Sequence, residues 1–317
     1  MKAFLELLNV SKHFKVKSGM LGLKSDLVRA VDGVTLTVAK GETLGLVGES
    51  GCGKSTLAKC IMGLESVTSG EIIFQDRSVN TWDEKKLRRK MQMVFQDPYS
   101  SLNPRQKIGS IIREGLDIHS IGTKEERALK VEELLGLVGL RPEHGKRYPH
   151  EFSGGQRQRV AVARTLALDP QLIVCDEPVS ALDVSVQAQV LRMLKDLQQV
   201  FNLTYVFISH DLSVVSHISD RVAVMYLGRI MELAPSDALF ASPKHPYTEA
   251  LLSAVLKPDP SDQPERIPLE GDLPSPMNPP TGCPFHPRCP KAFEKCPNAR
   301  PELREIEPGI KVACWLY

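Results

Sequence analysis

The fold of this chain follows from one stretch of nine residues, Gly48-Glu49-Ser50-Gly51-Cys52-Gly53-Lys54-Ser55-Thr56. A short apolar run over residues 43–47 precedes it, and a helical pattern over residues 55–62 follows it. Strand, glycine-rich loop and helix in this order form a phosphate-binding loop, because glycines let successive backbone N–H groups point at phosphate oxygens. Lys54 adds a positive charge for the β- and γ-phosphates, and the Ser55 hydroxyl can ligate Mg²⁺. The stretch therefore predicts a site for a nucleoside triphosphate.

A pair of carboxylates forms the second candidate element. The apolar residues 172–175 predict a buried strand, which ends in Asp176 and Glu177. Open α/β sheets bind ligands at the carboxyl ends of their strands. Asp176 is suited to orienting Mg²⁺ through water, and Glu177 to polarising an attacking water as a general base. Adjacent carboxylates are common on surface loops, but together with a phosphate-binding loop they indicate a catalytic pair.

The third element is Phe152-Ser153-Gly154-Gly155-Gln156, which opens a helical pattern over residues 155–168. Two glycines and a hydroxyl at a helix N-terminus can bind an anion. The same residues also form an ordinary helix cap, so the structural interpretation stays open. A single mononucleotide site does not need two phosphate cradles, whereas a head-to-tail dimer would use both.

Around these elements the chain alternates between strand and helix patterns, which indicates an α/β fold with a parallel sheet. A run of mostly helical patterns interrupts the alternation in the middle of the chain. The expected strands cover residues 3–8, 28–38, 43–47, 71–74, 92–95, 172–175, 204–209 and 221–233, the last broken at Gly228. The expected helices cover residues 55–62, 107–117, 124–138, 155–168, 184–200 and 212–218.

Composition and charge are those of a soluble globular protein. The 317 residues include 40 Lys and Arg against 38 Asp and Glu, and this balance gives no general attraction to nucleic acid or anionic lipid. Polar residues interrupt the start of the chain where a signal peptide needs an apolar run. No stretch approaches the ~18 apolar residues of a membrane helix. We therefore expect a cytoplasmic location and no nucleic-acid partner.

The three elements resemble the ATP-binding subunits of ABC transporters, and the resemblance covers roughly residues 3–255. Residues 48–56 resemble the Walker A loop, residues 152–156 the signature motif, and residues 172–177 the Walker B strand. Four single positions match in the same order: Phe14 as the ring that stacks on adenine, Gln96 as the Q-loop glutamine, Asp183 in the D-loop and His210 as the switch histidine.

The resemblance implies a P-loop ABC ATPase core with a mixed sheet. The nucleotide-binding domain would cover residues 1–255, with a helical subdomain at about 97–168. Catalysis is assigned to Glu177, His210 and Gln96, and Mg²⁺ to Ser55 and Gln96. The remaining ATP contacts are assigned to Phe14, Gly48, Glu49, Ser50, Gly51, Cys52, Gly53, Lys54, Thr56, Ser153, Gly154, Gly155, Gln156, Asp176 and Asp183. Two such domains would enclose two ATP molecules.

Two further segments, residues 95–105 and 245–254, resemble the ATPases of dipeptide and oligopeptide importers. The resemblance implies a peripheral ATPase at the cytoplasmic face of a prokaryotic membrane, which energises peptide import. Its implied partners are a second ABC ATPase (a paralogue or a second copy), two transmembrane permease subunits and an extracytoplasmic peptide-binding protein. Importers of nickel or glutathione look similar, and a soluble ABC ATPase outside transport is the other alternative.

The last 60 residues differ from the rest, with four of the seven Cys and 14 of the 23 Pro. We expect a proline-rich C-terminal extension over residues 256–317. Its thiols, Cys283, Cys289, Cys296 and Cys314, lack the tight pairs of most zinc modules, and the first three precede Pro. The resemblance to peptide-importer ATPases implies a [4Fe–4S] cluster at these four positions. Zn²⁺ remains the alternative.

Overall fold

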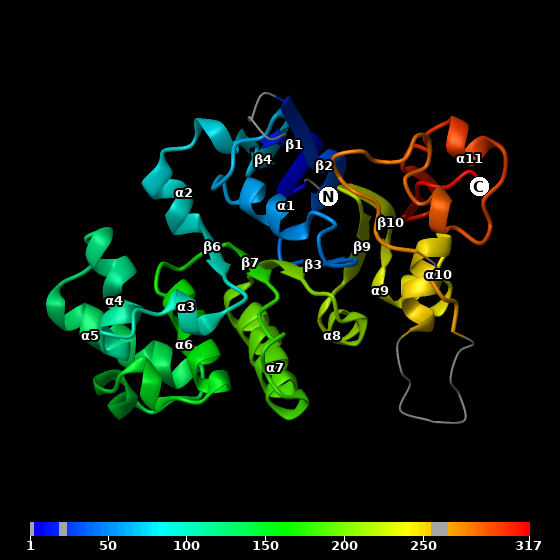
Figure 1. The fold of residues 1–317 in the computed structure, drawn as a ribbon. Helices are drawn as coiled ribbons and strands as arrows, with labels where there is room; N and C mark the ends of the chain where they lie inside the picture. Colours follow the sequence, from blue (N-terminus) through cyan, green and yellow to red (C-terminus); the bar gives the residue numbers. More distant parts are fainter. Residues whose placement is uncertain (1–2, 19–23, 255–265, 270) are drawn as a thin grey trace. The chain divides into compact units, whose positions relative to one another are not determined.

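The computed structural model describes residues 3–18, 24–254, 266–269 and 271–317 (Figure 1). The chain divides into two compact units. The first comprises Met1–Val38, Thr43–Asn80 and Ser209–Tyr317, and the second comprises Ala39–Glu42 and Thr81–Ile208. Residues 255–265 and 270, which include the start of the expected proline-rich extension, lie outside the described residues.

The first unit contains two groups of strands. One is an antiparallel sheet in the order β2 (Lys24–Val38), β1 (Leu5–Ser18), β4 (Ser69–Phe74) and β5 (Arg77–Ser78). The other runs in the order β11 (Arg304–Glu307), β12 (Ile310–Val312), β10 (Arg229–Pro235), β9 (Arg221–Tyr226) and β3 (Thr43–Val47). β3 pairs with β9 in parallel, and all five residues of β3 are buried.

The helices of the first unit are short. They are α1 (Lys54–Ile61), α8 (Leu212–Ile218), α9 (Ser236–Ala241), α10 (Pro246–Ser253), α11 (Lys295–Asn298) and the 3₁₀ turn η4 (His286–Arg288). A further 3₁₀ turn, η1 (Val79–Thr81), lies where the first unit meets the second along the chain. Pro246 opens α10, where a missing backbone N–H costs no helical hydrogen bond.

The cysteine-containing extension joins the sheet of the first unit. β12 pairs antiparallel with β10, with Glu232 opposite Val312. The Ala313 N–H continues this ladder by donating to the Met231 carbonyl oxygen at 2.8 Å. Main-chain hydrogen bonds therefore hold β12 and Ala313 of the extension to β10.

The second unit contains three parallel strands in the order β8 (Thr204–Ile208), β7 (Leu172–Asp176) and β6 (Met91–Val94). Every residue of β7 and β8 is buried, as expected for strands covered on both faces. Its helices are α2 (Glu84–Lys90), α3 (Pro98–Ser101), α4 (Ile108–Ile118), α5 (Lys124–Leu137), α6 (Gly154–Leu166) and α7 (Val184–Phe201), with the 3₁₀ turns η2 (Pro142–Lys146) and η3 (Pro149–Glu151).

The strand and helix patterns predicted for the middle of the chain are confirmed. α4, α5, α6 and α7 and the strands β3, β7 and β8 each lie within a few residues of their expected ranges. The first expected strand was too short, because β1 continues through polar residues to Ser18. The short helix α2 and the terminal strands β11 and β12 were not predicted.

Candidate functional site

The predicted phosphate-binding loop connects β3 to α1 in the first unit. Gly48 and Gly53 have φ angles of 151° and 108°, a region that L side chains rarely adopt. A Cβ atom on Gly48 would lie 2.1 Å from the carbonyl oxygen of Met225, and one on Gly53 would lie 2.0 Å from that of Ala30. The loop backbone is therefore packed against its neighbours so closely that both positions require glycine.

Lys54 lies inside the curve of this loop, with only 5% of its surface exposed. Its Nζ donates to the carbonyl oxygens of Gly48, at 2.7 Å, and Glu49, at 3.0 Å, and contacts Cys52 Sγ at 3.7 Å. Ser55, the next residue, is exposed on the first turn of α1, as a hydroxyl that could ligate Mg²⁺ must be. The loop thus encloses the cation that a triphosphate needs.

Glu49, in the middle of the loop, has two partners that the sequence did not indicate. Its backbone N–H donates to Tyr247 Oη at 3.0 Å. Its carboxylate accepts two hydrogen bonds from Arg288, at 2.7 and 3.1 Å. These partners are 198 and 239 residues away along the chain, and no local sequence pattern could have identified them.

Phe14 and His210 are also in the first unit. Phe14 is half-buried on β1, and the Lys12 ammonium lies 4.8 Å from the centre of its ring. His210 is exposed, directly after Ser209, whose N–H donates to the Leu46 carbonyl oxygen of β3 at 3.2 Å. Their assigned roles, adenine stacking and γ-phosphate sensing, stay predictions.

The predicted catalytic carboxylates lie at the carboxyl end of β7 in the second unit. Asp176 is the last residue of the strand and is 7% exposed. Glu177 follows with a φ of 47°, a strained backbone conformation of the kind that clusters at active sites. Gln96, 81 residues earlier, donates from Nε2 to Glu177 Oε2 at 3.0 Å. The structure therefore brings together two of the three residues assigned to catalysis.

The glycine-rich element of the second unit begins α6. Ser153 and Gln156 form a capping box, in which each side chain accepts a hydrogen bond from the other residue's backbone N–H, at 3.1 and 3.3 Å. A Cβ atom on Gly155 would lie 2.3 Å from Val186 Cγ1. The ordinary capping role left open by the sequence is therefore present.

The same element also lines an open groove of about 640 Å³. Three arginines, Arg141, Arg147 and Arg159, line this groove together with Ser153 and Gln156. Cationic side chains beside a helix N-terminus favour an anionic ligand. The groove is therefore compatible with the anion-binding role as well.

Asp183 caps α7 in the second unit. Its carboxylate accepts hydrogen bonds from the Val186 N–H, at 2.9 Å, and the Ser185 hydroxyl, at 2.8 Å. These hydrogen bonds lower the pKa of the Asp183 carboxyl. Asp183 is therefore a charged residue with a structural task, and its assignment to the nucleotide site stays a prediction.

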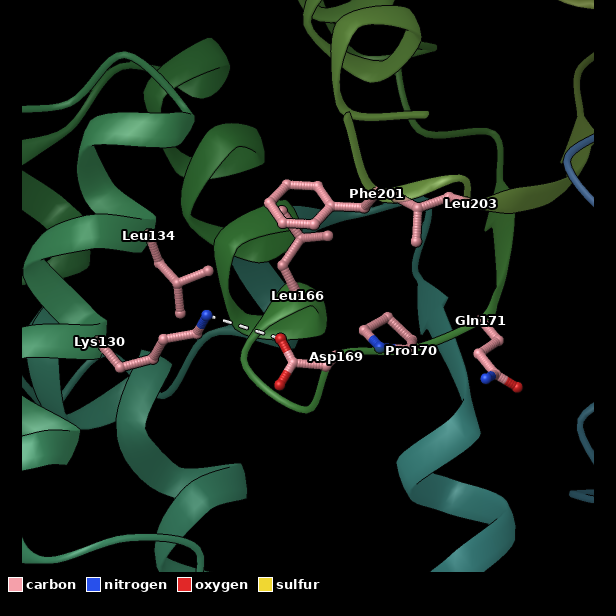
Figure 2. Close-up of a pocket in the computed structure, with 8 residues that line it drawn as sticks. All are labelled: Lys130, Leu134, Leu166, Asp169, Pro170, Gln171, Phe201 and Leu203. Carbon is pink, nitrogen blue, oxygen red and sulfur yellow. Dashed lines mark ion pairs between the residues drawn. The ribbon is translucent and has the colours of Figure 1, made fainter. Parts of the chain in front are cut away.

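A separate cavity of about 220 Å³ lies among α5, α6, α7 and the start of β7 (Figure 2). Lys130 and Asp169 form an ion pair at 3.6 Å across one side of it, and Leu134, Leu166, Pro170, Phe201 and Leu203 supply apolar surface. None of the residues assigned to ATP lines this cavity, and it has no glycine-rich backbone to cradle phosphate.

The four cysteines of the extension line one small cavity of about 10 Å³. All four are free thiols: Cys283, Cys289, Cys296 and Cys314. Burial and the neighbouring thiols raise the pKa of Cys283 to about 11, and burial raises that of Cys289 and Cys314. Within the described ranges, however, no three His, Cys, Asp or Glu side chains are arranged to hold a metal ion. The cluster stays a prediction.

The phosphate-binding loop can be tested with Gly53→Ala. The added Cβ would collide with the Ala30 carbonyl oxygen and force the loop to open, so we expect MgATP affinity to fall by about tenfold or more. Equilibrium titration with a fluorescent ATP analogue measures this. Gly136→Ala on α5 is the matched control, because a Cβ there meets nothing within 4 Å. Equal affinities for the two variants would contradict the assignment.

Two protein families match the chain. The family described as "ABC transporter" matches residues 31–180, and "Oligopeptide/dipeptide transporter, C-terminal region" matches residues 231–296. Among solved structures, the ATP-binding cassette MJ0796 in a dimeric, post-hydrolysis state bound to ADP and Pi is 30% identical, with a TM-score of 0.64 over 73% of this chain and 98% of that one. The cassette cbiO1 of Clostridium perfringens is 25% identical, with a TM-score of 0.66 over 76% of this chain and 92% of that one. These likenesses confirm the expected ABC ATPase fold.

Curated relatives match over nearly their whole length. The oligopeptide transport ATP-binding protein AppF of Bacillus subtilis is 55% identical over 100% of this chain and 98% of its own. The dipeptide transport ATP-binding protein DppF of Escherichia coli is 52% identical over 98% of this chain and 93% of its own. The chain therefore belongs to the family of ATP-binding subunits of oligopeptide and dipeptide ABC transporters.

Proposed function

We propose that this chain hydrolyses ATP to energise the import of dipeptides or oligopeptides through an ABC transporter. The observation that carries the proposal is a glycine-rich loop closed around Lys54, in a chain whose relatives over full length are peptide-transport ATP-binding proteins. Among the described residues, every helix is too short or too polar to span a bilayer. We infer a peripheral subunit on the cytoplasmic face of a prokaryotic membrane.

Lys54 is the group that would bind the β- and γ-phosphates. Its ammonium donates to the carbonyl oxygens of Gly48 and Glu49 and to Cys52 Sγ. Those bonds hold the side chain along the inner face of the loop, where the N–H groups of the loop and of the first turn of α1 can meet phosphate oxygens. ATP would add a negatively charged partner to a cation whose position is already fixed.

Glu177 would act as the general base that polarises the attacking water. The hydrogen bond from Gln96 Nε2 orients its carboxylate, whose oxygens would accept the proton of the water. Because the Gln96 nitrogen is used in that bond, its amide oxygen is the group that can ligate Mg²⁺, with the Ser55 hydroxyl as the second ligand. When bound, Mg²⁺ would neutralise charge on the transferring phosphoryl group. Asp176 would orient the ion through water.

A second ABC ATPase would complete each site. The support is the second anion cradle, Ser153-Gly154-Gly155, with the arginine-lined groove beside it. A solved structure of a 30% identical cassette is described as dimeric and bound to ADP and Pi. We propose that ATP joins Lys54 of one ATPase to this cradle of the other, and that hydrolysis removes the shared phosphate.

Glu177→Gln tests the catalytic assignment. The amide can still accept a hydrogen bond but cannot take a proton, so we expect ATP hydrolysis to fall by at least about 100-fold while MgATP binding is retained. Trapped ATP should also favour the closed dimer. Turnover is measured by phosphate release, and dimerisation by light scattering with and without MgATP. Undiminished turnover would overturn the role of Glu177.

Transport itself can be tested in cells that lack this gene. Complementation with the wild-type gene should restore uptake of labelled di- or oligopeptides, and Lys54→Ala should not. Uptake of labelled nickel and of labelled glutathione is measured in the same cells. Restored uptake of either of these instead of peptides would indicate a different importer. The tagged chain should copurify with two multispanning membrane proteins. Copurification with neither, from detergent-solubilised membranes, would favour a soluble ABC ATPase outside transport.

We also propose that the extension, residues 256–317, forms a small unit whose four cysteines hold a [4Fe–4S] cluster. The support is that all four thiols are free and line one cavity. The donor set suits either a cluster or Zn²⁺, because both bind thiolates. Burial raises the pKa of the Cys283 thiol, so a metal that binds the thiolate would release a proton. The bound group would cross-link the four cysteines and so stabilise an extension that is too short for a large hydrophobic core.

Metal analysis of anaerobically purified protein checks this proposal. A cluster predicts about four iron and four sulfide per chain with broad visible absorption, lost in Cys296→Ser. Cys60→Ser is the matched control, because Cys60 is buried on α1 and does not line that cavity. A colourless protein with one zinc per chain would favour Zn²⁺, and a protein with neither metal would contradict any metal role.

A further inference from the structure

Every polar group of Glu49, at the centre of the phosphate-binding loop, is engaged. Its N–H donates to Tyr247 Oη, its carbonyl oxygen accepts from Lys54 Nζ, and its carboxylate accepts from Arg288. A residue fixed at its N–H, carbonyl and side chain cannot rotate without breaking one of these bonds. Glu49 therefore connects Lys54 to residues far along the chain.

The ion pair between Arg288 and Glu49 has a rigid geometry. Nη1 and Nη2 each donate to a different carboxylate oxygen, at 2.7 and 3.1 Å, which is the bidentate geometry of the strongest ion pairs. The Arg288 side chain is only 6% exposed, and its guanidinium lies 6.0 Å from the centre of the Tyr226 ring. The Glu49 side chain is 27% exposed, so water could reach its carboxylate if Arg288 were removed, but it would not restore the bidentate restraint.

Arg288 belongs to the short segment that carries the extension's thiols. It ends the 3₁₀ turn His286–Arg288 and is followed directly by Cys289. Phe285, just before the turn, is fully buried, and its ring lies 5.4 Å from that of Tyr226 and 5.3 Å from that of Tyr247. A change in the position of Cys289 would therefore be passed to Arg288 and to the rings around it.

Tyr247 provides a second route to the part of the extension that carries Cys283, Cys289, Cys296 and Cys314, which we call the cysteine unit. Its N–H donates to His245 Nδ1 at 3.0 Å, and the imidazole is fully buried. Burial lowers the pKa of His245 to about 3, so the ring stays neutral and Nδ1 remains an acceptor. The same ring is hydrogen-bonded to the backbone of Ala313, which precedes Cys314. Two of the four cysteines are thus one residue away from a side chain or backbone group that leads to Glu49.

We propose that Arg288 and Tyr247 are positioning residues for ATP, through which the cysteine unit holds the phosphate-binding loop. The loop's affinity for MgATP then depends on whether the cysteine unit keeps Arg288 in place. The inference rests on the proposed ATP site at Lys54, and it goes further by coupling that site to the C-terminal extension.

Titration of MgATP binding to single variants tests the contact. Arg288→Met should weaken binding by about tenfold, because the loop loses a restraint that pre-organises it. Arg288→Lys keeps the charge but loses the bidentate geometry. Its MgATP affinity should lie between those of the wild type and Arg288→Met. Glu307→Gln is the matched control: it removes another ion pair of the extension, with Lys244 at 3.1 Å, and Glu307 does not line the cavity of the four cysteines. Equal affinities of Arg288→Met and Glu307→Gln would overturn the proposal.

A double-mutant cycle separates positioning from a general loss of structure. If Arg288 acts through Glu49, then Glu49→Gln combined with Arg288→Met should bind MgATP about as weakly as the weaker single variant, because the second change removes nothing further. Additive losses would contradict the proposal, since they would mean that each residue affects binding by its own route. Near-ultraviolet circular dichroism of each variant verifies that it is folded.

The link to the thiols is tested with Cys289→Ser in two backgrounds. It should weaken MgATP binding in the wild-type chain and have little effect when Arg288 is already Met. An equal effect in both backgrounds, or none in the wild type, would contradict the coupling. Lys54→Ala distinguishes a failure of the proposed ATP site from a failure of the proposed coupling. If Lys54→Ala binds MgATP normally, the proposed ATP site itself is wrong, whereas if only the Arg288 variants bind normally, only the coupling is wrong.

Discussion

The candidate site of the first unit depends on one constraint, the close packing of the loop backbone at Gly48 and Gly53. Carbonyl oxygens of Met225 and Ala30 occupy the space that side chains would need at those positions. The loop can curl inward only because both residues are glycine, and the curl is what encloses Lys54. The strand pairing of β3 with β9 and the contacts of Glu49 both act to hold that curl in place.

In the second unit, the residues assigned to catalysis follow buried strands. β7 is buried along its length and releases Asp176 and Glu177 at its carboxyl end, where Gln96 binds the Glu177 side chain. Further along the chain, α6 and α7 each begin with a side chain that accepts backbone N–H groups, Ser153 and Asp183. The residues assigned to catalysis in this unit thus follow buried strands, and the capping residues begin helices.

The sequence predicted the elements whose signal is local, and it failed where the signal is tertiary. β3, β7 and β8 are short apolar runs between turns, which marks buried strands. α2 was missed because Leu87 is its only buried residue, so it lacks an apolar period. The contacts of Glu49 with Tyr247 and Arg288 join residues about 200 positions apart, and only the folded chain brings them together.

The central claim is that MgATP binds in the loop around Lys54. Hydrogen–deuterium exchange of the backbone amides of residues 48–56, with and without a non-hydrolysable ATP analogue and Mg²⁺, tests it most directly. If the loop binds MgATP, exchange in this segment should slow on binding, because the N–H groups donate to phosphate oxygens. Binding of the analogue with unchanged exchange at residues 48–56 would contradict an ATP site in this loop.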